Sequence, residues 1–320
     1  MTQGSTPSHD YARRAALTAA VDGAAAEVIG ELANAGVRSI LLKGRAFASW
    51  LYTQNELRSY GDVDLLLSPT DFSTAESVLA GLGFLRFPVA GVEHADTWSH
   101  ESAHMEVELH RTLIGVSADP GRLWEVLSRR TEPLALGNTV VEMLDAAGRT
   151  LHVALHAAQH GTGGEKPLED LARALNQVPR VTWECALSLG EELDATEAFA
   201  AGLRLMPEGE RLATELQLSD KASPSTILMT GSPPPAALGL ARVASTRGVR
   251  AKARVLARKL IPEPDFMRMT SGLARRGRTG LAASYGLRIC WLAWRFGPAL
   301  AAWVGARSEA RSRGERESST

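Results

Sequence analysis

The chain of 320 residues has only two cysteines, Cys185 and Cys290, too few for a disulfide framework. It also lacks an opening charged segment followed by an apolar run, which is the pattern of a secretory leader. Both absences predict a reduced, intracellular setting, with the cytoplasm as the expected location.

A long apolar run without charges is missing as well. The stretch 281–304 is mostly apolar, but Arg288, Arg295 and Pro298 interrupt it. Each central arginine would cost a membrane-spanning helix about 2.5–3.5 kcal/mol. The stretch is therefore expected to pack as a helix on the body of the protein. Peripheral membrane contact through 281–304 stays open, because tryptophan and arginine together are also typical of interfacial helices.

The formal net charge of −1 conceals an asymmetry. Residues 240–320 hold 17 Lys and Arg against five Asp and Glu, a charge of +12, while residues 1–239 carry −13. A basic tail on an acidic body indicates docking within the molecule or an anionic partner. A nucleic-acid partner is disfavoured, because the tail lacks regular aromatic interleaving and the body is acidic.

The most informative stretch is 37–67. Two short apolar runs, Ser39–Leu42 and Val63–Leu67, lie on either side of a helical pattern, and glycines stand next to them. This arrangement predicts a strand, a helix and a second strand beside a site that the backbone approaches closely.

Asp62 and Asp64 are two residues apart at the second of these strands. Side chains alternate along a strand, so both carboxylates are expected on one face and Val63 and Leu65 on the other. Two close carboxylates raise each other's pKa, and a divalent cation removes that cost. Hard oxygen ligands of this kind favour Mg²⁺, with Mn²⁺ as the substitute, together with the phosphates of a substrate.

Lys43 and Gly44 follow the first strand, where a helix is expected to begin. Glycine permits close backbone approach, a helix N-terminus offers free N–H groups, and Lys43 adds positive charge. The junction therefore predicts a phosphate site suited to a triphosphate.

A third polar strand is expected at 104–110, where Met105, Val107 and Leu109 alternate with His104, Glu106, Glu108 and His110. Ionisable groups on one face indicate a cleft, although an exposed edge strand has the same pattern. A zinc site made of these four residues alone is disfavoured, because neighbours on one strand face seldom complete a tetrahedron.

Histidines recur farther along, on the helix expected at 146–159, with His152, His156 and His160 on one stripe. Zinc binding is disfavoured because the glutamate of a His-Glu-x-x-His motif is absent. A hydrogen bond from His156 or His160 to Asp170 in the following helix is the preferred interpretation. Whether His104, His110, His156 and His160 reach the cleft stays open.

The order Lys43-Gly44, a helix ending at Tyr52, Arg58 and then Gly-Asp-Val-Asp-Leu-Leu-Leu resembles the uncharacterised nucleotidyltransferases of the DNA polymerase β-like superfamily. Lys43 stands where that family usually has the first residue of a Gly-Gly or Gly-Ser pair, and the gap to Asp62 is longer than in compact members. The resemblance is strongest at 40–67, weaker at 104–110 and 151–175, and faint beyond 240.

The resemblance implies an α/β fold with a mixed, mostly antiparallel sheet, flanked by helices and extended by a helical C-terminal region. It implies that Asp62 and Asp64 hold Mg²⁺ and that Glu108, with Glu106 as the weaker candidate, is the third carboxylate. Lys43, the Gly44 backbone and Arg58 would contact the triphosphate and the leaving pyrophosphate. The expected domains are a disordered segment at 1–10, a catalytic domain at 11–145, a helical subdomain at 146–218, a Pro/Ser-rich linker at 219–239 and a basic helical region at 240–320.

The function implied is metal-dependent transfer of a nucleotidyl group from a nucleoside triphosphate, such as ATP, in a biosynthetic setting. The acceptor stays unknown, and a peptide, a natural product, a sugar or a protein hydroxyl all fit. The alternative is a non-catalytic nucleotide-binding or interaction protein on the same fold.

Overall fold

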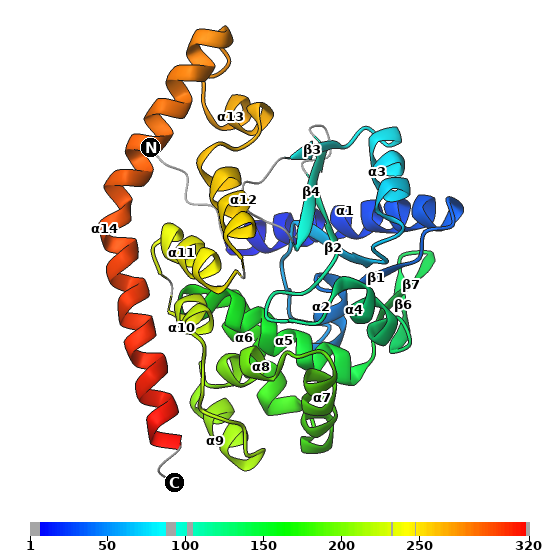
Figure 1. The fold of residues 1–320 in the computed structure, drawn as a ribbon. Helices are drawn as coiled ribbons and strands as arrows, with labels where there is room; N and C mark the ends of the chain where they lie inside the picture. Colours follow the sequence, from blue (N-terminus) through cyan, green and yellow to red (C-terminus); the bar gives the residue numbers. More distant parts are fainter. Residues whose placement is uncertain (1–6, 88–93, 101–104, 232, 247, 318–320) are drawn as a thin grey trace. The chain divides into compact units, whose positions relative to one another are not determined.

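A computed structural model describes residues 7–87, 94–100, 105–231, 233–246 and 248–317 (Figure 1). The chain forms two compact units. The first holds the residues up to Phe87, His94–Val153 and Arg173–Asp194, and the second holds Ala154–Ala172 and the residues from Ala195 onward.

The first unit is built on a seven-stranded mixed sheet with the order β3-β4-β5-β2-β1-β7-β6. Two neighbouring pairs, β1 with β7 and β2 with β5, are parallel, and the other pairs are antiparallel. The strands are β1 Ser39–Leu41, β2 Asp62–Leu67, β3 Leu85–Phe87, β4 Ala95–His100, β5 Met105–His110, β6 Thr131–Leu136 and β7 Thr139–Leu144. The mixed, mostly antiparallel α/β sheet predicted from the sequence is confirmed.

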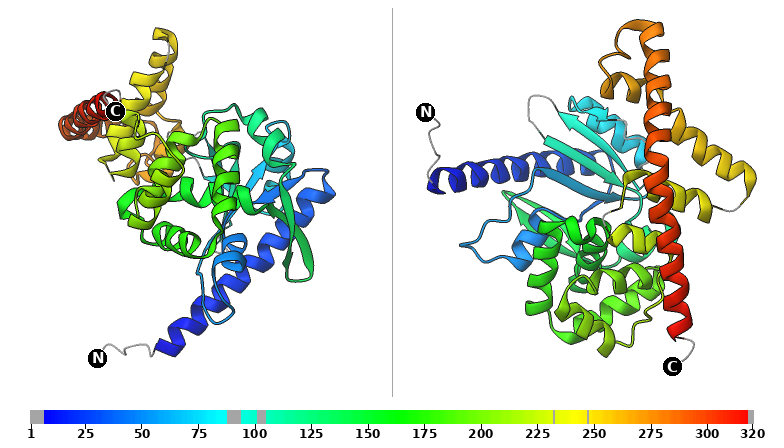
Figure 2. Two further views of the ribbon diagram at one scale, coloured as in Figure 1. Left: turned by 90° about the horizontal axis from the view of Figure 1, so that it is seen from below. Right: turned by 90° about the vertical axis from the view of Figure 1, so that its left-hand side faces the viewer.

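Helices α1 and α3 cover one face of this sheet (Figures 1 and 2). Val28 and Leu32 of α1 and Leu79 of α3 belong to one buried cluster with Val63 and Leu65 of β2. Because side chains alternate along β2, burial of Val63 and Leu65 on this side turns Asp62 and Asp64 to the opposite face. The apolar core therefore determines on which side the acidic pair lies.

The helices that belong to the first unit are α1 Pro7–Asn34, α2 Arg45–Leu51, α3 Phe72–Gly81, α4 Pro120–Leu127, the start of α5 Ala146–His160, the end of α6 Glu165–Gln177, and α7 Arg180–Glu192. The second unit adds α8 Thr196–Leu203, α9 Pro207–Glu215, α10 Pro224–Thr230, α11 Pro235–Ser245, α12 Val249–Leu260, α13 Pro264–Thr270 and α14 Gly277–Glu317. In the described part of the chain, no helix is long and apolar enough to cross a membrane.

Several elements differ from the sequence-based expectations. Helix α1 begins at Pro7, inside the segment expected to be disordered; residues 1–6 lie outside the described part. The stretch 219–239, expected to be a linker, carries α10 and the start of α11, each with proline in its first turn, where the missing N–H is not needed. The basic helical region expected at 240–320 is divided among the end of α11 and α12, α13 and α14. The division of the chain into functional domains stays a prediction.

Candidate functional site

Parallel pairing of β2 with β5 brings the acidic groups of the two strands together. In this register Asp62 lies opposite Glu106, and Asp64 lies opposite Glu108. Neighbours in register share a face of the sheet, so the two strands present their carboxylates to the same side. The site is therefore a product of the sheet order, in which residues 44 positions apart in the sequence become neighbours.

Asp64 is the centre of this arrangement and is almost completely buried. Its Oδ1 lies 2.7 Å from Nζ of Lys43 and 2.9 Å from Nε2 of His110. Its Oδ2 is buried without a hydrogen-bond partner among the described residues. One carboxylate oxygen thus receives two cationic partners, and the other retains unused bonding capacity.

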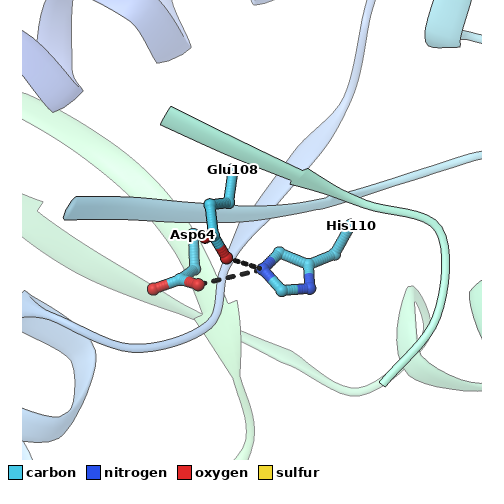
Figure 3. Close-up of side chains that lie close together, drawn as sticks. All are labelled: Asp64, Glu108 and His110. Atoms are coloured by element: carbon cyan, nitrogen blue, oxygen red, sulfur yellow. Dashed lines mark hydrogen bonds and ion pairs between the residues drawn. The ribbon is translucent and has the colours of Figure 1, made fainter. Parts of the chain in front are cut away.

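Figure 3 shows the imidazole of His110 directed at two carboxylates from neighbouring strands. The same Nε2 that faces Asp64 lies 3.3 Å from Oε2 of Glu108. Glu108 is half-buried, with 28% of its side chain exposed, whereas Glu106 is exposed. Glu108 is therefore the glutamate of β5 that belongs to the cluster.

The two aspartates differ in their electrostatics. Burial raises the pKa of Asp62, and the nearby charge of Asp64 raises it further. Burial would also raise the pKa of Asp64, but Lys43 and the hydrogen bond with His110 outweigh it and hold that pKa well below its usual range. A raised pKa, expected from the sequence for both aspartates, is therefore found only at Asp62, where burial is the larger cause and repulsion by Asp64 the smaller.

The cationic partners are shifted in the complementary direction. Burial lowers the pKa of Lys43 and of His110, but contact with Asp64 outweighs it in both, so both pKa values are raised. His94 stacks near His110, with ring centroids 5.7 Å apart, and burial lowers its pKa to about 4. Near neutral pH, His94 is thus neutral, whereas contact with Asp64 favours the charged forms of Lys43 and His110.

The turn at Gly44 carries Lys43 into this cluster. Gly44 has a φ of 58° and a ψ of −116°, which is accessible to glycine and strained for other residues. A Cβ here would also lie 3.3 Å from the ring of Tyr60. Tyr60 is held in turn by a hydrogen bond that its hydroxyl donates to Asp22. Glycine is therefore required by both the backbone and the packing.

Arg58 lies beneath the same turn. Its guanidinium donates to the carbonyl of Gly44 at 3.4 Å and lies over the rings of Phe47 and Tyr60, at 5.4 Å and 6.0 Å from their centroids. Only 5% of Arg58 is exposed. Its charge is thus placed behind the Lys43–Gly44 backbone.

The residues present fit a divalent cation. Asp64, Glu108 and His110 each offer a ligand atom, and these atoms lie within 4.8 Å of one another. The buried Oδ2 of Asp64 has no hydrogen-bond partner among the described residues, which is expected of an oxygen that binds a ligand. A set of two carboxylates and an imidazole suits Mg²⁺ or Mn²⁺, and the nitrogen favours the latter.

The structure brings several of the residues singled out in the sequence close together. Lys43 and Glu108 come close to Asp64, and Asp62 lies beside it on the same strand face. His110 was not among the predicted ligands, although its place two residues after Glu108 already put it on the same strand face. The described residues do not form a zinc site from one strand, because Glu106 is exposed and Asp64, which lies near Glu108 and His110, belongs to β2. His104 lies outside the described residues.

The other histidines lie on α5. His152 belongs to the first unit, where its ring packs 5.5 Å from that of Phe47. His156 and His160 belong to the second unit, and their rings meet edge to face with centroids 4.7 Å apart. The hydrogen bond expected between one of them and Asp170 stays a prediction.

Comparisons with known proteins identify the family of the chain. A family model described as "Uncharacterised nucleotidyltransferase" matches residues 8–208, which is more than half of the chain. No curated protein matches the chain. Among solved structures, the antibiotic-resistance factor ANT(2'')-Ia is 12% identical with a TM-score of 0.40, covering 55% of this chain and 96% of that one. An antigenic nucleotidyltransferase-like protein from Paracoccidioides brasiliensis is 17% identical with a TM-score of 0.39, covering 63% and 92%.

Proposed function

The chain belongs to the family of uncharacterised nucleotidyltransferases, and from this premise we propose that it transfers a nucleotidyl group from a metal-bound nucleoside triphosphate to an acceptor hydroxyl. The observation that supports the metal-dependent reaction best is the cluster at Asp64. There a buried carboxylate, a half-buried glutamate, an imidazole and an ammonium group converge within hydrogen-bonding distance.

Asp64, Glu108 and His110 would hold a divalent cation, and Asp62 would complete the acidic face beside them. Such a cation would supply charge neutralisation for the triphosphate and lower the pKa of an acceptor hydroxyl. In its absence, Lys43 and His110 neutralise Asp64. A group that is already neutralised by an ammonium can exchange that partner for a cation without exposing a bare buried charge.

Lys43 has a second role in this proposal. When its ammonium leaves Asp64, the charge lies at the end of a flexible side chain anchored next to Gly44, within reach of a bound phosphate. Arg58 adds positive charge behind the same turn and holds the carbonyl of Gly44. The two cations would therefore orient the triphosphate. Arg58 would contribute its positive charge and would also hold the Gly44 turn in place through its hydrogen bond.

Glu108 would face the acceptor. Its side chain is 28% exposed, whereas that of Asp64 is 1% exposed, so Glu108 is the more accessible of the two carboxylates in contact with His110. A carboxylate in this position can accept the proton of an attacking hydroxyl, and His110 would hold it in place. The acceptor's class, whether peptide, natural product, sugar or protein hydroxyl, is left to the experiment.

A transfer assay tests these roles. Purified protein would be incubated with α-labelled nucleoside triphosphates, Mg²⁺ or Mn²⁺, and candidate acceptors. Asp64→Asn and Glu108→Gln are expected to lower transfer at least about a hundredfold, which is the scale of a lost metal ligand or base. Glu106→Gln is the matched control: it changes the same residue type on the same strand, and its exposed side chain predicts full activity. Equal losses in both glutamate variants would refute the role of Glu108.

The alternative, a non-catalytic nucleotide-binding protein on the same fold, is separated by thermal unfolding. A nucleotide that binds only the folded protein stabilises it by mass action. At a nucleotide concentration of about a hundred times Kd, the free energy of unfolding increases by about 2.7 kcal/mol, and the melting temperature rises with it. Stabilisation by nucleotide and metal without labelled product, over a wide set of acceptors, would favour the binding protein. Turnover that Asp64→Asn removes would favour the enzyme.

A further inference from the structure

Helix α14 has its large apolar side chains on the outside. The residues of α14 that are buried are small or polar: Gly280, Ser284, Ala299 and Ala306. Several large apolar side chains of the same helix are exposed instead: Leu287, Trp291, Trp294, Phe296, Leu300 and Val304. A surface helix ordinarily buries its large apolar residues and exposes its polar ones. The reversed pattern indicates that this helix contacts a partner.

These side chains form two rows on different sides of the helix, because successive helical residues are about 100° apart. Leu287, Trp291 and Trp294 follow one side of α14 at spacings of four and three, and Phe296, Leu300 and Val304 follow another at spacings of four. Between these rows, the inner side of the helix packs through Ala299 and Ala306 against α10 and α11. The two apolar rows therefore flank the outer side of α14, which Figures 1 and 2 show as one long helix coloured orange to red.

The charge of the same region selects the partner. Residues 266–308 contain seven arginines and neither aspartate nor glutamate. The guanidinium of Arg295 lies 4.8 Å from the ring centroid of Trp291 and 6.0 Å from that of Trp294, and Arg307 lies 4.8 Å from that of Trp303. Arginine side chains thus lie directly over the aromatic rings of this helix. The partner must combine negative charge with an apolar interior.

Three partners can be compared on this basis. A second copy of the chain that packed its own α14 against this helix would bring the same arginines together, and these would repel one another. A nucleic acid supplies the negative charge, but it has no use for exposed Leu287, Leu300 and Val304. A bilayer with anionic phospholipids supplies both, because headgroups attract arginine and the acyl boundary accepts tryptophan and aliphatic side chains.

We propose that α14 binds in the plane of an anionic phospholipid bilayer, with Trp294 and Phe296 in the acyl boundary and Arg295 among the headgroups. Trp294 is 76% exposed and Phe296 is 49% exposed, and Arg295 lies between them in the sequence. Helix α12 adds Arg250, Lys252 and Arg254 with exposed Val249 and Leu256, so the second unit holds further basic and apolar groups of the same kind. This property is independent of the reaction at Asp64.

Vesicle flotation of the full-length protein tests the proposal. Vesicles of phosphatidylcholine alone would be compared with vesicles that also contain phosphatidylglycerol, each at low and at high salt. The protein is expected to float with the anionic vesicles only, and less at high salt, because screening weakens attraction to the headgroups. Flotation with neither kind, or equally with both, would overturn the proposal.

Matched variants identify the surface. Arg295→Glu changes two charges near the headgroups and is expected to weaken binding about 30-fold; Trp294→Ser is expected to weaken it about tenfold. Two controls carry the same chemical changes elsewhere: Arg211→Glu on α9 and Val181→Ser on α7, both exposed positions, are expected to change binding less than about threefold. Circular dichroism would confirm equal helix content in all four.

Two further results would reassign the surface. Equal loss in Arg295→Glu and Arg211→Glu would mean that binding follows overall charge, and the helix would have no special role. A concentration-dependent dimer in light scattering that Trp294→Ser dissociates, or saturable RNA binding that Arg295→Glu removes, would assign α14 to a second copy or to nucleic acid. Either outcome would refute the membrane proposal.

Discussion

Replacing Lys43 by methionine is the most informative single change at the site. The substitution keeps the length and apolar stem of the side chain and removes only the ammonium group, which lies 2.7 Å from Oδ1 of Asp64. Lys43 is 13% exposed and Asp64 is 1% exposed. The change therefore leaves a buried carboxylate with His110 as its remaining close cationic partner.

The expected cost follows from that burial. Removing one partner of a buried ion pair costs about 3–5 kcal/mol, because the other charge stays buried and unpaired. His110 still contacts the same oxygen at 2.9 Å, so we expect the lower end, about 3 kcal/mol. In a thermal melt this corresponds to about 6 °C or more. Lys221→Met is the control: that lysine forms an exposed pair with Glu317, and its loss should cost about 0–1 kcal/mol.

The same substitution should tighten metal binding. A divalent cation and the Lys43 ammonium compete for Asp64, so removing the ammonium frees the carboxylate. Titration calorimetry with Mn²⁺, without nucleotide, measures this effect. If metal binding restores about half or more of the 3 kcal/mol of stability lost with the ammonium, Kd is expected to be about tenfold to a hundredfold lower in Lys43→Met than in the unaltered protein. Triphosphate affinity should change in the opposite direction, because the proposed phosphate contact is lost.

Two results would refute this reasoning. If Lys43→Met loses stability but binds Mn²⁺ with unchanged affinity, Lys43 does not compete with the metal and the cation binds elsewhere. If stability changes no more than in Lys221→Met, the contact at 2.7 Å is not a significant ion pair in solution. Neither result depends on an assay of activity.

Two other predictions concern the surroundings of the site. Gly44→Ala should lower the free energy of unfolding, measured by chemical denaturation, by about 2 kcal/mol or more, because φ is 58° and the new Cβ meets Tyr60. Gly61→Ala, with nothing within 4 Å of its Cβ, should lower it by about 1 kcal/mol less. Equal losses in the two variants would contradict the strained turn. Burial lowers the pKa of His152 to about 3, so this histidine is neutral in the folded protein but protonates below about 6.5 when unfolded. Its contribution to stability is complete above that pH and is lost, by about 1.4 kcal/mol per pH unit, as the pH falls toward 3. Unfolding titrations between pH 7 and pH 5 should therefore show a shallower loss in His152→Phe, and parallel curves would contradict the burial of a neutral imidazole.

The sequence predicted the strand faces well, because alternation is a local property. Met105, Val107 and Leu109 alternate with polar residues, and so they locate the core face of β5 without knowledge of any partner. Asp62 and Asp64 follow from the same argument on β2. What alternation cannot supply is the register between strands, which places Asp64 opposite Glu108. That pairing depends on a sheet order in which β2 and β5 are neighbours.

Elements without a local apolar pattern were missed. Strand β4 has the sequence Ala-Asp-Thr-Trp-Ser-His, whose polar residues show no alternation, and it pairs on both sides with β3 and β5. Strand β6 contains Pro133, which lacks a backbone N–H donor. The proline is tolerated because β6 is an edge strand that pairs only with β7 among the described strands. In both strands, tertiary pairing outweighs sequence preference.

His110 shows why the electrostatics of the site could not be read from spacing alone. Two carboxylates on one strand predict mutual repulsion and raised pKa values, and that holds for Asp62. At Asp64 the sign reverses, because β1 delivers Lys43 and β5 delivers His110 to the same oxygen. A divalent cation that binds Oδ1 of Asp64 would compete with both partners, and coordination by His110 would require a ring nitrogen without a proton, so metal binding should release protons. The acidic pair is therefore only half of the site; the two cations from neighbouring strands determine how readily a metal can enter.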